Sequence, residues 1–277
     1  MDTHLIIGGT GKVGGRVADD LRNAGRPVRV ATRKGGDVRF DWYDPATYAP
    51  ALGDVEAVYL TGPGSSTDYS PLVSDFLAEA GRAGVRRVVL LSARAAIFQP
   101  DGVVARAEQA VRDSPVSWTI LRPSWFAQNF TEGIFIPRDD TVTAPVGDGL
   151  EPFIDVADIA AVAAATLTGD QHDGETIDLS GPEAMTFAEA VAVVGEQAGR
   201  NLRFEAADPG DFALEMSNAG MTDLYVAWRM AMFEGIRDGR DAFLSDGVER
   251  VLGRPATTFA AWAAREAPSL RDPAGRP

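Results

Sequence analysis

The chain contains no cysteine and only two histidines, His4 and His172. Without cysteine it cannot form disulfides, thiolate nucleophiles or cysteine-ligated metal sites. Two histidines cannot build a histidine-rich metal centre, and His4 stands at the start of an apolar run, where a structural role is expected. We therefore expect no metal cofactor.

Lysine is nearly absent as well, because Lys12 and Lys34 are the only two in 277 residues. All basic residues together number 26 against 40 Asp and Glu, and the formal net charge is −14. Such a surface repels phosphate backbones and anionic lipid. Nucleic acid and membranes are therefore not expected partners.

Long apolar segments are also missing. No run approaches the roughly 20 residues that cross a membrane, and MDTHLIIGG lacks the basic and apolar regions of a signal peptide. We therefore expect a cytoplasmic protein. Hydrophobic residues make up 45% and charged residues 24% of the chain, as in ordinary globular proteins.

Short apolar runs alternate with helical patterns through the first half of the chain. Expected strands are Leu5–Gly8, Val28–Thr32, Val38–Phe40, Ala57–Leu60, 85–93 and 116–123, and expected helices are Val13–Ala24, Ser70–Ala83 and Val103–Arg112. Apolar strands separated by helices are typical of βαβ units. The sequence therefore predicts an α/β fold with a Rossmann-type, doubly wound parallel sheet.

The regular alternation of apolar strands and helices ends after Pro123. Residues 131–153 are rich in Gly, Pro and Thr and are expected to be loops. Later expectations are a helix at 155–167, a strand at 176–181, and helices at 186–198, about 209–219, 222–238 and 257–266. We expect a main domain at 1–130, with 155–180 returning to it. Residues 131–154 and 181–268 would form a smaller, mainly helical lobe, and 269–277 a disordered tail.

A glycine-rich turn follows the first expected strand. Gly8, Gly11 and Gly14 are spaced G-x-x-G-x-x-G, and Gly9 with the last two also satisfies G-x-G-x-x-G. Such a turn lets the backbone approach a pyrophosphate at a helix N-terminus. The strand–turn–helix context favours dinucleotide binding over a purely structural turn. The residues expected there are Gly8, Thr10, Gly11, Lys12, Val13 and Gly14.

The second expected strand ends in Thr32, Arg33 and Lys34. An acid at this place would bind the ribose 2′-hydroxyl of NAD, whereas a guanidinium suits a 2′-phosphate and Thr32 can add a hydroxyl donor. NADP(H) is therefore the expected cofactor. The alternative is that the basic pair is only solvated surface. Ligands bind at the carboxyl ends of such strands, so we also expect cofactor contacts from Thr61, Gly62, Pro63, Ser92 and Pro123.

Several segments together resemble the NmrA-like, atypical branch of the short-chain dehydrogenase/reductase superfamily, closest to the ergot-alkaloid reductases of the agroclavine/festuclavine dehydrogenase type and their bacterial relatives. They are GGTGKVG, VRFDWYDPATY, AVYLTGP, RRVVLLSA, SWTILRPSWFAQNF and FIDVADIAAVA. The resemblance implies a Rossmann sheet, NADP(H), and a substrate cleft under the C-terminal lobe. It also implies that Ser92 lies near the nicotinamide.

The same resemblance implies a substrate pocket formed by residues from both halves of the chain. The residues expected to line it are Arg94, Phe98, Trp125, Phe126, Tyr225, Trp228 and Met232. For Trp125 and for the aromatic and methionine stripe of residues 221–239, core packing is an open alternative. Ser92 and Tyr225 are the candidate catalytic residues, with Tyr225 a possible proton donor.

The Tyr-x-x-x-Lys dyad of classical short-chain dehydrogenases is missing, because Gly8 and Val30 stand four residues before the two lysines. Some NmrA-like reductases place a lysine in the helix before the sixth strand, where this chain has Arg106 and Glu108. Iminium, quinone and conjugated enone acceptors need no strong protein acid. We therefore expect an NADPH-dependent reductase of such a molecule, working as a monomer or homodimer. A non-catalytic NADP(H)-binding regulator, or a non-redox isomerase or cyclase, remains an alternative.

Overall fold

The computed structural model describes residues 3–64 and 67–271, and the chain divides into two compact units. The first unit contains residues 1–123, 156–178 and 247–254, and the second contains 124–155, 179–246 and 255–277. The expected division had assigned 247–254 to the lobe. These residues join the first unit because Arg250 pairs with Glu175 at 2.7 Å and Arg254 pairs with Asp158 at 2.8 Å.

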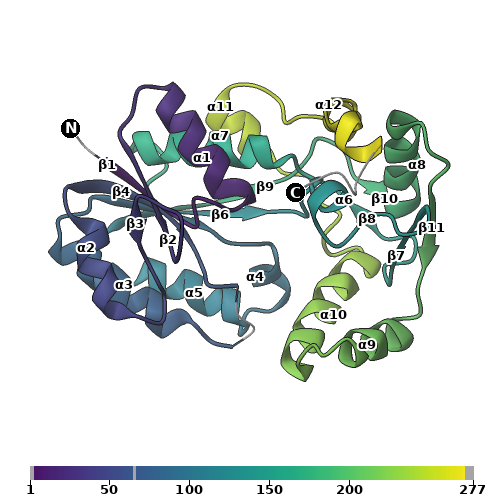
Figure 1. Cartoon of the computed structure of the whole chain (residues 1–277), viewed down its shortest axis with the longest axis horizontal. Coiled ribbons are helices and arrows are strands. Elements are labelled where there is room, and N and C mark those ends of the chain that lie inside the picture. The colour runs from purple at the N-terminus through teal and green to yellow at the C-terminus, as the bar shows by residue number, and fades with distance from the viewer. Residues whose placement is uncertain (1–2, 65–66, 272–277) are drawn as a thin grey trace. The chain divides into compact units, whose positions relative to one another are not determined.

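The first unit is built on a seven-stranded sheet in the order β3-β2-β1-β4-β5-β6-β9 (Figure 1). The pairings from β3 across to β6 are all parallel. This is the expected doubly wound, Rossmann-type sheet. Its strands are β1 (Thr3–Ile7), β2 (Val28–Thr32), β3 (Val38–Arg39), β4 (Val55–Thr61), β5 (Arg87–Leu91), β6 (Ser117–Pro123) and β9 (Glu175–Leu179).

Helices cover both faces of this sheet (Figure 1). On one face α1 (Lys12–Asn23) packs against α7 (Val156–Thr168), which in turn contacts α11 (Gly247–Leu252). On the other face lie α2 (Tyr48–Leu52), α3 (Ser70–Arg82) and α5 (Val103–Arg112), with the short η1 (Pro45–Thr47) and α4 (Ala95–Phe98) between elements. The amphipathic α1 buries Val13, Val17 and Leu21 toward the sheet, as its 3.6-residue period predicts.

The direction of winding reverses between β1 and β4. β1 pairs with β2 on one side and with β4 on the other, so the loops after β1 and β4 diverge at the carboxyl edge. Such a switch point opens a crevice for ligands in open α/β sheets. The glycine turn after β1 and the Thr61–Pro63 segment after β4 both lie there.

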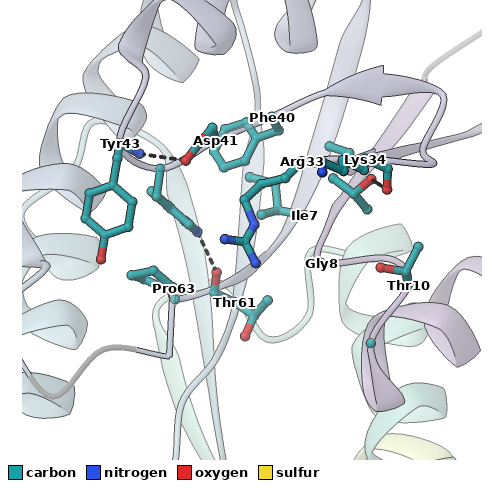
Figure 2. A pocket seen from close by; sticks show the side chains of 15 residues that line it. Ile7, Gly8, Thr10, Arg33, Lys34, Phe40, Asp41, Tyr43, Thr61 and Pro63 are labelled. Atoms are coloured by element: carbon teal, nitrogen blue, oxygen red, sulfur yellow. Dashed lines mark hydrogen bonds between the residues drawn. The ribbon is translucent and has the colours of Figure 1, made fainter. Parts of the chain in front are cut away.

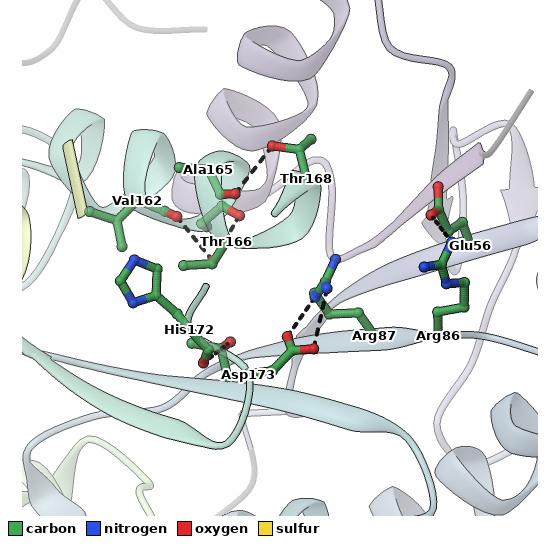
Figure 3. Close-up of polar contacts among 11 residues, drawn as sticks. Glu56, Arg86, Arg87, Val162, Ala165, Thr166, Thr168, His172 and Asp173 are labelled. Carbon is green, nitrogen blue, oxygen red and sulfur yellow. Dashed lines mark hydrogen bonds and ion pairs between the residues drawn. The ribbon is translucent and has the colours of Figure 1, made fainter. Parts of the chain in front are cut away.

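Polar contacts at the opposite, amino-terminal edge are structural (Figure 3). Arg87 makes a two-pronged ion pair with Asp173, at 2.7 and 3.2 Å, and Arg86 pairs with Glu56 at 3.1 Å. His172 belongs to this edge, where its carbonyl accepts from the Thr119 hydroxyl at 2.9 Å. These contacts fix the ends of β5, β6 and β9 and lie away from the crevice.

The second unit contains α6 (Asn129–Glu132), β7 (Thr141–Ala144), β8 (Leu150–Glu151), β10 (Met185–Thr186), α8 (Phe187–Ala198), β11 (Arg203–Ala206), α9 (Pro209–Asn218), α10 (Asp223–Arg237) and α12 (Phe259–Arg271). The expectation of loops across 131–153 was wrong at β7 and β8. β7 pairs with β11, and β8 pairs with β10. These strands are too short for a local pattern, and their partners lie tens of residues away.

Aromatic side chains dominate the core of this unit, which includes Phe130, Phe153, Phe187, Phe259 and Trp262. The helix α8 is fixed at its start by a capping box between Thr186 and Glu189. Of the expected disordered tail, residues 269–271 continue α12, and residues 272–277 lie outside the described residues.

Residues 3–64 and 67–271 contain neither a membrane-spanning helix nor a cluster of metal ligands. Neither unit has a described helix that is long and apolar enough to cross a membrane. The described His, Asp and Glu side chains form no group of three or more that could hold a metal ion.

Candidate functional site: a cavity at the switch between β1 and β4

A cavity of about 690 Å³ opens at the carboxyl edge of the sheet, where β1, β2 and β4 end (Figure 2). Nine residues that the sequence predicted as cofactor contacts line it: Gly8, Thr10, Gly11, Thr32, Arg33, Lys34, Thr61, Gly62 and Pro63. Three separate segments therefore meet as expected. Lys12, Val13, Gly14, Ser92 and Pro123 are not among its lining residues.

The glycine turn has the geometry that a pyrophosphate requires. Gly8 has a φ of 75°, and a methyl group there would lie 2.6 Å from the Thr61 side chain. A methyl group on Gly14 would lie 2.5 Å from the Gly8 carbonyl oxygen, so only glycine lets α1 approach β1 this closely. Gly11 caps α1 without any side-chain hydrogen bond. The N-terminus of α1 begins directly after the cavity-lining Thr10 and Gly11 and carries the positive end of the helix dipole, which an anionic ligand favours.

The basic pair lies at the other side of the cavity. Arg33 and Lys34 are exposed, and Figure 2 shows the Arg33 side chain extending into the cavity. Neither makes an ion pair with any carboxylate among the described residues, although acids outnumber bases in this chain. The Thr32 hydroxyl donates to the Lys34 carbonyl at 2.8 Å. It therefore shapes the turn, and the cationic groups remain available to a ligand.

A third wall, from Phe40 to Tyr43, was missed by sequence reasoning. Phe40 and Trp42 are buried against Tyr48 and Phe76, with ring centroids 5.1 to 6.3 Å apart. The Trp42 Nε1–H donates to the Thr61 carbonyl at 3.2 Å, which ties this wall to the end of β4. The signal was present as the aromatic segment FDWY directly after β3.

Comparison with known proteins supports the expected binding of a nicotinamide dinucleotide. The family model described as NAD(P)H-binding matches residues 8–170, more than half of the chain. The chain is 36% identical over 272 residues to the uncharacterized oxidoreductase YesF of Bacillus subtilis, covering 95% of this chain and 94% of that protein. It is 32% identical over 277 residues to agroclavine dehydrogenase of Claviceps fusiformis, covering 93% of this chain and 95% of that protein.

The chain belongs to the NAD(P)H-binding family. Within it, the chain is a member of the NmrA-like, atypical short-chain dehydrogenases/reductases, as the sequence motifs indicated. The crystal structure of NmrA, a negative transcriptional regulator, in complex with NAD has the same fold, with a TM-score of 0.78 at 13% identity, covering 100% of this chain and 98% of that one. The expected nicotinamide dinucleotide cofactor and the oxidoreductase class are confirmed.

At the place of the family serine, Ser92 follows β5 and takes part in a buried polar cluster. Its hydroxyl donates to Glu108 Oε1 at 2.5 Å. Glu108, on α5, is fully buried and also accepts from Arg122 at 2.8 and 2.5 Å and from Arg112 at 2.8 Å. Burial by itself raises the pKa of Glu108, but the hydrogen bonds from Arg122 and Ser92 outweigh it and hold that pKa below its ordinary value.

Tyr69 lies near the cavity and was also missed by sequence reasoning. Its ring packs so closely on Gly62 that a methyl group there would lie 2.7 Å from it. Burial, together with the charges of Glu108 and Asp68, raises the pKa of Tyr69 to about 12. Tyr69 is therefore a protonated phenol at neutral pH. Nothing in the spacing of the sequence distinguished it.

The remaining cofactor candidates have structural positions beside the turn. Val13 and Gly14 are buried on α1, and the Lys12 carbonyl accepts from the Arg16 guanidinium at 2.7 Å. Pro123 ends β6, and its carbonyl accepts from the Arg94 N–H at 3.3 Å. Their contact with cofactor stays a prediction.

The residues expected at the substrate fall into both units. In the first, Arg94 is buried and Phe98 is half-buried at the end of α4. In the second, Trp125 is 7% exposed and stacks on Phe233 with centroids 5.4 Å apart, so core packing accounts for most of its ring. Phe126, Tyr225, Trp228 and Met232 are half-buried.

Proposed function

We propose that the protein is an NADPH-dependent reductase that transfers hydride to a conjugated or iminium-type small molecule without a Tyr-Lys dyad. The observation that carries the choice of NADPH is the unpaired basic pair, Arg33 and Lys34, in the wall of the cavity. When bound, the cofactor supplies the hydride. The glycine turn and the N-terminus of α1 would hold its pyrophosphate, and Arg33 its 2′-phosphate.

One acid also lines the cavity, and it limits the electrostatic preference. Asp41 accepts the Tyr43 backbone N–H at 3.1 Å, so its carboxylate is partly satisfied within the protein. Two cations against one acid leave the wall net positive. A 2′-phosphate is therefore favoured over a 2′-hydroxyl by roughly one charge-assisted hydrogen bond, about 1.5 kcal/mol or more.

Ser92 would position the nicotinamide or an ordered water and would not protonate the acceptor. A carboxylate is a hydrogen-bond acceptor only, so the Ser92 hydrogen is committed to Glu108. Its oxygen is left with lone pairs, which suit an amide N–H. Tyr225 remains the candidate proton donor.

The weak supply of protein acids fits the proposed acceptors. Hydride addition to an iminium carbon gives a neutral amine, and a reduced quinone or enone leaves a delocalised anion. Catalysis would then come from holding the acceptor against the cofactor and excluding water. The similarity to agroclavine dehydrogenase and the match to the NAD(P)H-binding family support an oxidoreductase that uses this cofactor.

The test is to follow the loss of NADPH absorbance with three acceptors: menadione, a cyclic enone and a cyclic iminium salt. Turnover of at least one, lowered about tenfold or more in Ser92→Ala with unchanged NADPH affinity, is expected. Tight NADPH binding without consumption of any acceptor in a broad screen would instead favour the regulatory alternative. Product formation without NADPH loss would favour the isomerase alternative.

A further inference from the structure

Arg229 on α10 is enclosed by aromatic rings of the second unit. Its guanidinium carbon lies 5.0 Å from the Trp228 ring, 5.3 Å from the Tyr225 ring and 5.8 Å from the Trp125 ring. Contacts at these distances stabilise the guanidinium through its attraction to the ring faces.

No carboxylate within the described part of the chain makes an ion pair with Arg229. The next arginine along α10, Arg237, lies near Glu234 and Asp238, at 3.9 and 4.0 Å. In a protein with 40 acids and a net charge of −14, an unpaired and half-buried guanidinium is unexpected on structural grounds alone. Its charge is available to a ligand.

Two polar groups beside Arg229, on Tyr225 and Trp228, carry hydrogens with no acceptor among the described residues. Arg229 Nη2 donates to the Tyr225 hydroxyl oxygen at 2.6 Å. A guanidinium cannot accept, so the Tyr225 hydrogen is not used in this contact. The buried Trp228 Nε1–H likewise has no acceptor among the residues that the structure describes. The cluster of Tyr225, Trp228 and Arg229 thus offers N–H and O–H groups beside flat rings.

We propose that this cluster binds the anionic group, a carboxylate or a phosphate, of a planar conjugated substrate. Guanidinium and hydroxyl donors match anionic oxygens, and the ring faces match a conjugated skeleton. A cationic iminium would meet like charge and no acceptor. The inference rests on the proposed reductase function and narrows its acceptors to anionic, conjugated molecules, with Tyr225 donating to the bound oxygen.

The test is tryptophan fluorescence, because Trp228 belongs to the cluster and the Trp125 ring lies 5.8 Å from the Arg229 guanidinium carbon. Naphthyl phosphate, naphthoate and naphthylmethylammonium share one ring system and differ in charge. Wild-type protein is expected to bind at least one of the two anions at least about tenfold more tightly than the cation. Comparison of the two anions distinguishes phosphate from carboxylate.

Arg229→Gln is expected to abolish the difference in affinity between the anions and the cation, and Arg229→Lys to keep part of it. Tyr225→Phe is expected to weaken binding of the anions alone. Arg237→Gln, which removes a paired charge from the same helix, is the matched control and should bind as wild type. Circular dichroism melting checks that each variant is folded. Equal binding of the anions by wild type and a folded Arg229→Gln, or equal binding of anions and cation by wild type, overturns the inference.

NADPH binding is measured on the same samples. Intact NADPH binding with no charge preference among the naphthyl probes would remove only this inference. Absence of dinucleotide binding would remove the proposed reductase function itself, whatever the naphthyl probes show.

Discussion

The hydroxyl of Ser92 lies 2.5 Å from Glu108 Oε1 and donates its hydrogen to that fully buried carboxylate. The two residues are sixteen positions apart, one at the end of β5 and the other on α5. Arg122 and Arg112 neutralise the carboxylate. The protein therefore directs the hydrogen of the Ser92 hydroxyl toward Glu108 before any ligand binds.

Replacing Glu108 by Gln should lower the free energy of unfolding by about 3 kcal/mol. The substitution removes the charge that compensates two partly buried guanidinium groups, and unpaired buried charges are costly. Urea unfolding measures the change. Glu79→Gln, which breaks a pair with the exposed Arg82, is the control and should cost under about 1 kcal/mol. A loss at position 108 no larger than at position 79 would contradict the assignment of Glu108 as the centre of the cluster.

The same residue predicts a pH dependence. The pKa of Glu108 in the folded protein lies below its ordinary value of 4.5. Its contribution to stability is therefore complete above that value and is lost as the pH falls through the lowered pKa. The difference in free energy of unfolding between wild type and Glu108→Gln should shrink as the pH falls below about 5. A difference that stays constant or grows on acidification would show that the carboxylate is not stabilised in its charged form.

Two neighbouring glycines of α1 should respond in opposite ways to alanine. In Gly14→Ala the new methyl group meets the Gly8 backbone at 2.5 Å, which should cost about 1–3 kcal/mol and weaken dinucleotide binding. In Gly15→Ala the nearest atom is 3.5 Å away, so helix propensity should add about 0.5–1 kcal/mol. Thermal melting and NADPH titration of both variants check this. Similar behaviour of the two would refute the close approach of α1 to β1.

Tyr59 is a fully buried residue of β4 whose hydroxyl has no hydrogen-bond partner among the described residues. Tyr59→Phe should therefore raise the free energy of unfolding by about 1 kcal/mol, since an unsatisfied buried hydroxyl is removed. Tyr48→Phe should lower it by a similar amount, because the Tyr48 hydroxyl donates to the Trp42 carbonyl at 2.8 Å. Chemical denaturation of both variants measures these changes in the free energy of unfolding. A loss of stability in Tyr59→Phe would mean that the hydroxyl has a partner after all.

Much of the first unit could be predicted from local patterns. The apolar runs at β1, β2 and β5 and the helical period of α1 are local signals. The glycine spacing likewise predicted Gly8 and Gly11, which line one wall of the cavity. The Phe40–Tyr43 wall has a local signal in its aromatic residues, but its place at the cavity depends on Phe40 and Trp42 packing against Tyr48 of α2 and Phe76 of α3.

Glu108 shows a second limit of sequence reasoning. On an amphipathic helix an acid is expected to face water, and only the tertiary fold shows that Arg122 and Arg112 converge on it. The expectation of loops across 131–153 was wrong for a related reason, since β7 pairs with β11 about 60 residues later and their register has no local signature.

The assignment of the cavity to NADPH is tested most directly by dissociation constants for NADPH and NADH in wild type, Arg33→Ala and Arg26→Ala. Arg26 is an exposed arginine that does not line the cavity, so its removal changes the net charge equally. Wild type and Arg26→Ala should bind NADPH at least about tenfold more tightly than NADH, a difference of about 1.4 kcal/mol, and Arg33→Ala should lose that preference. Equal affinity of wild type for the two cofactors, or an undiminished preference in Arg33→Ala, would contradict the role of the basic pair.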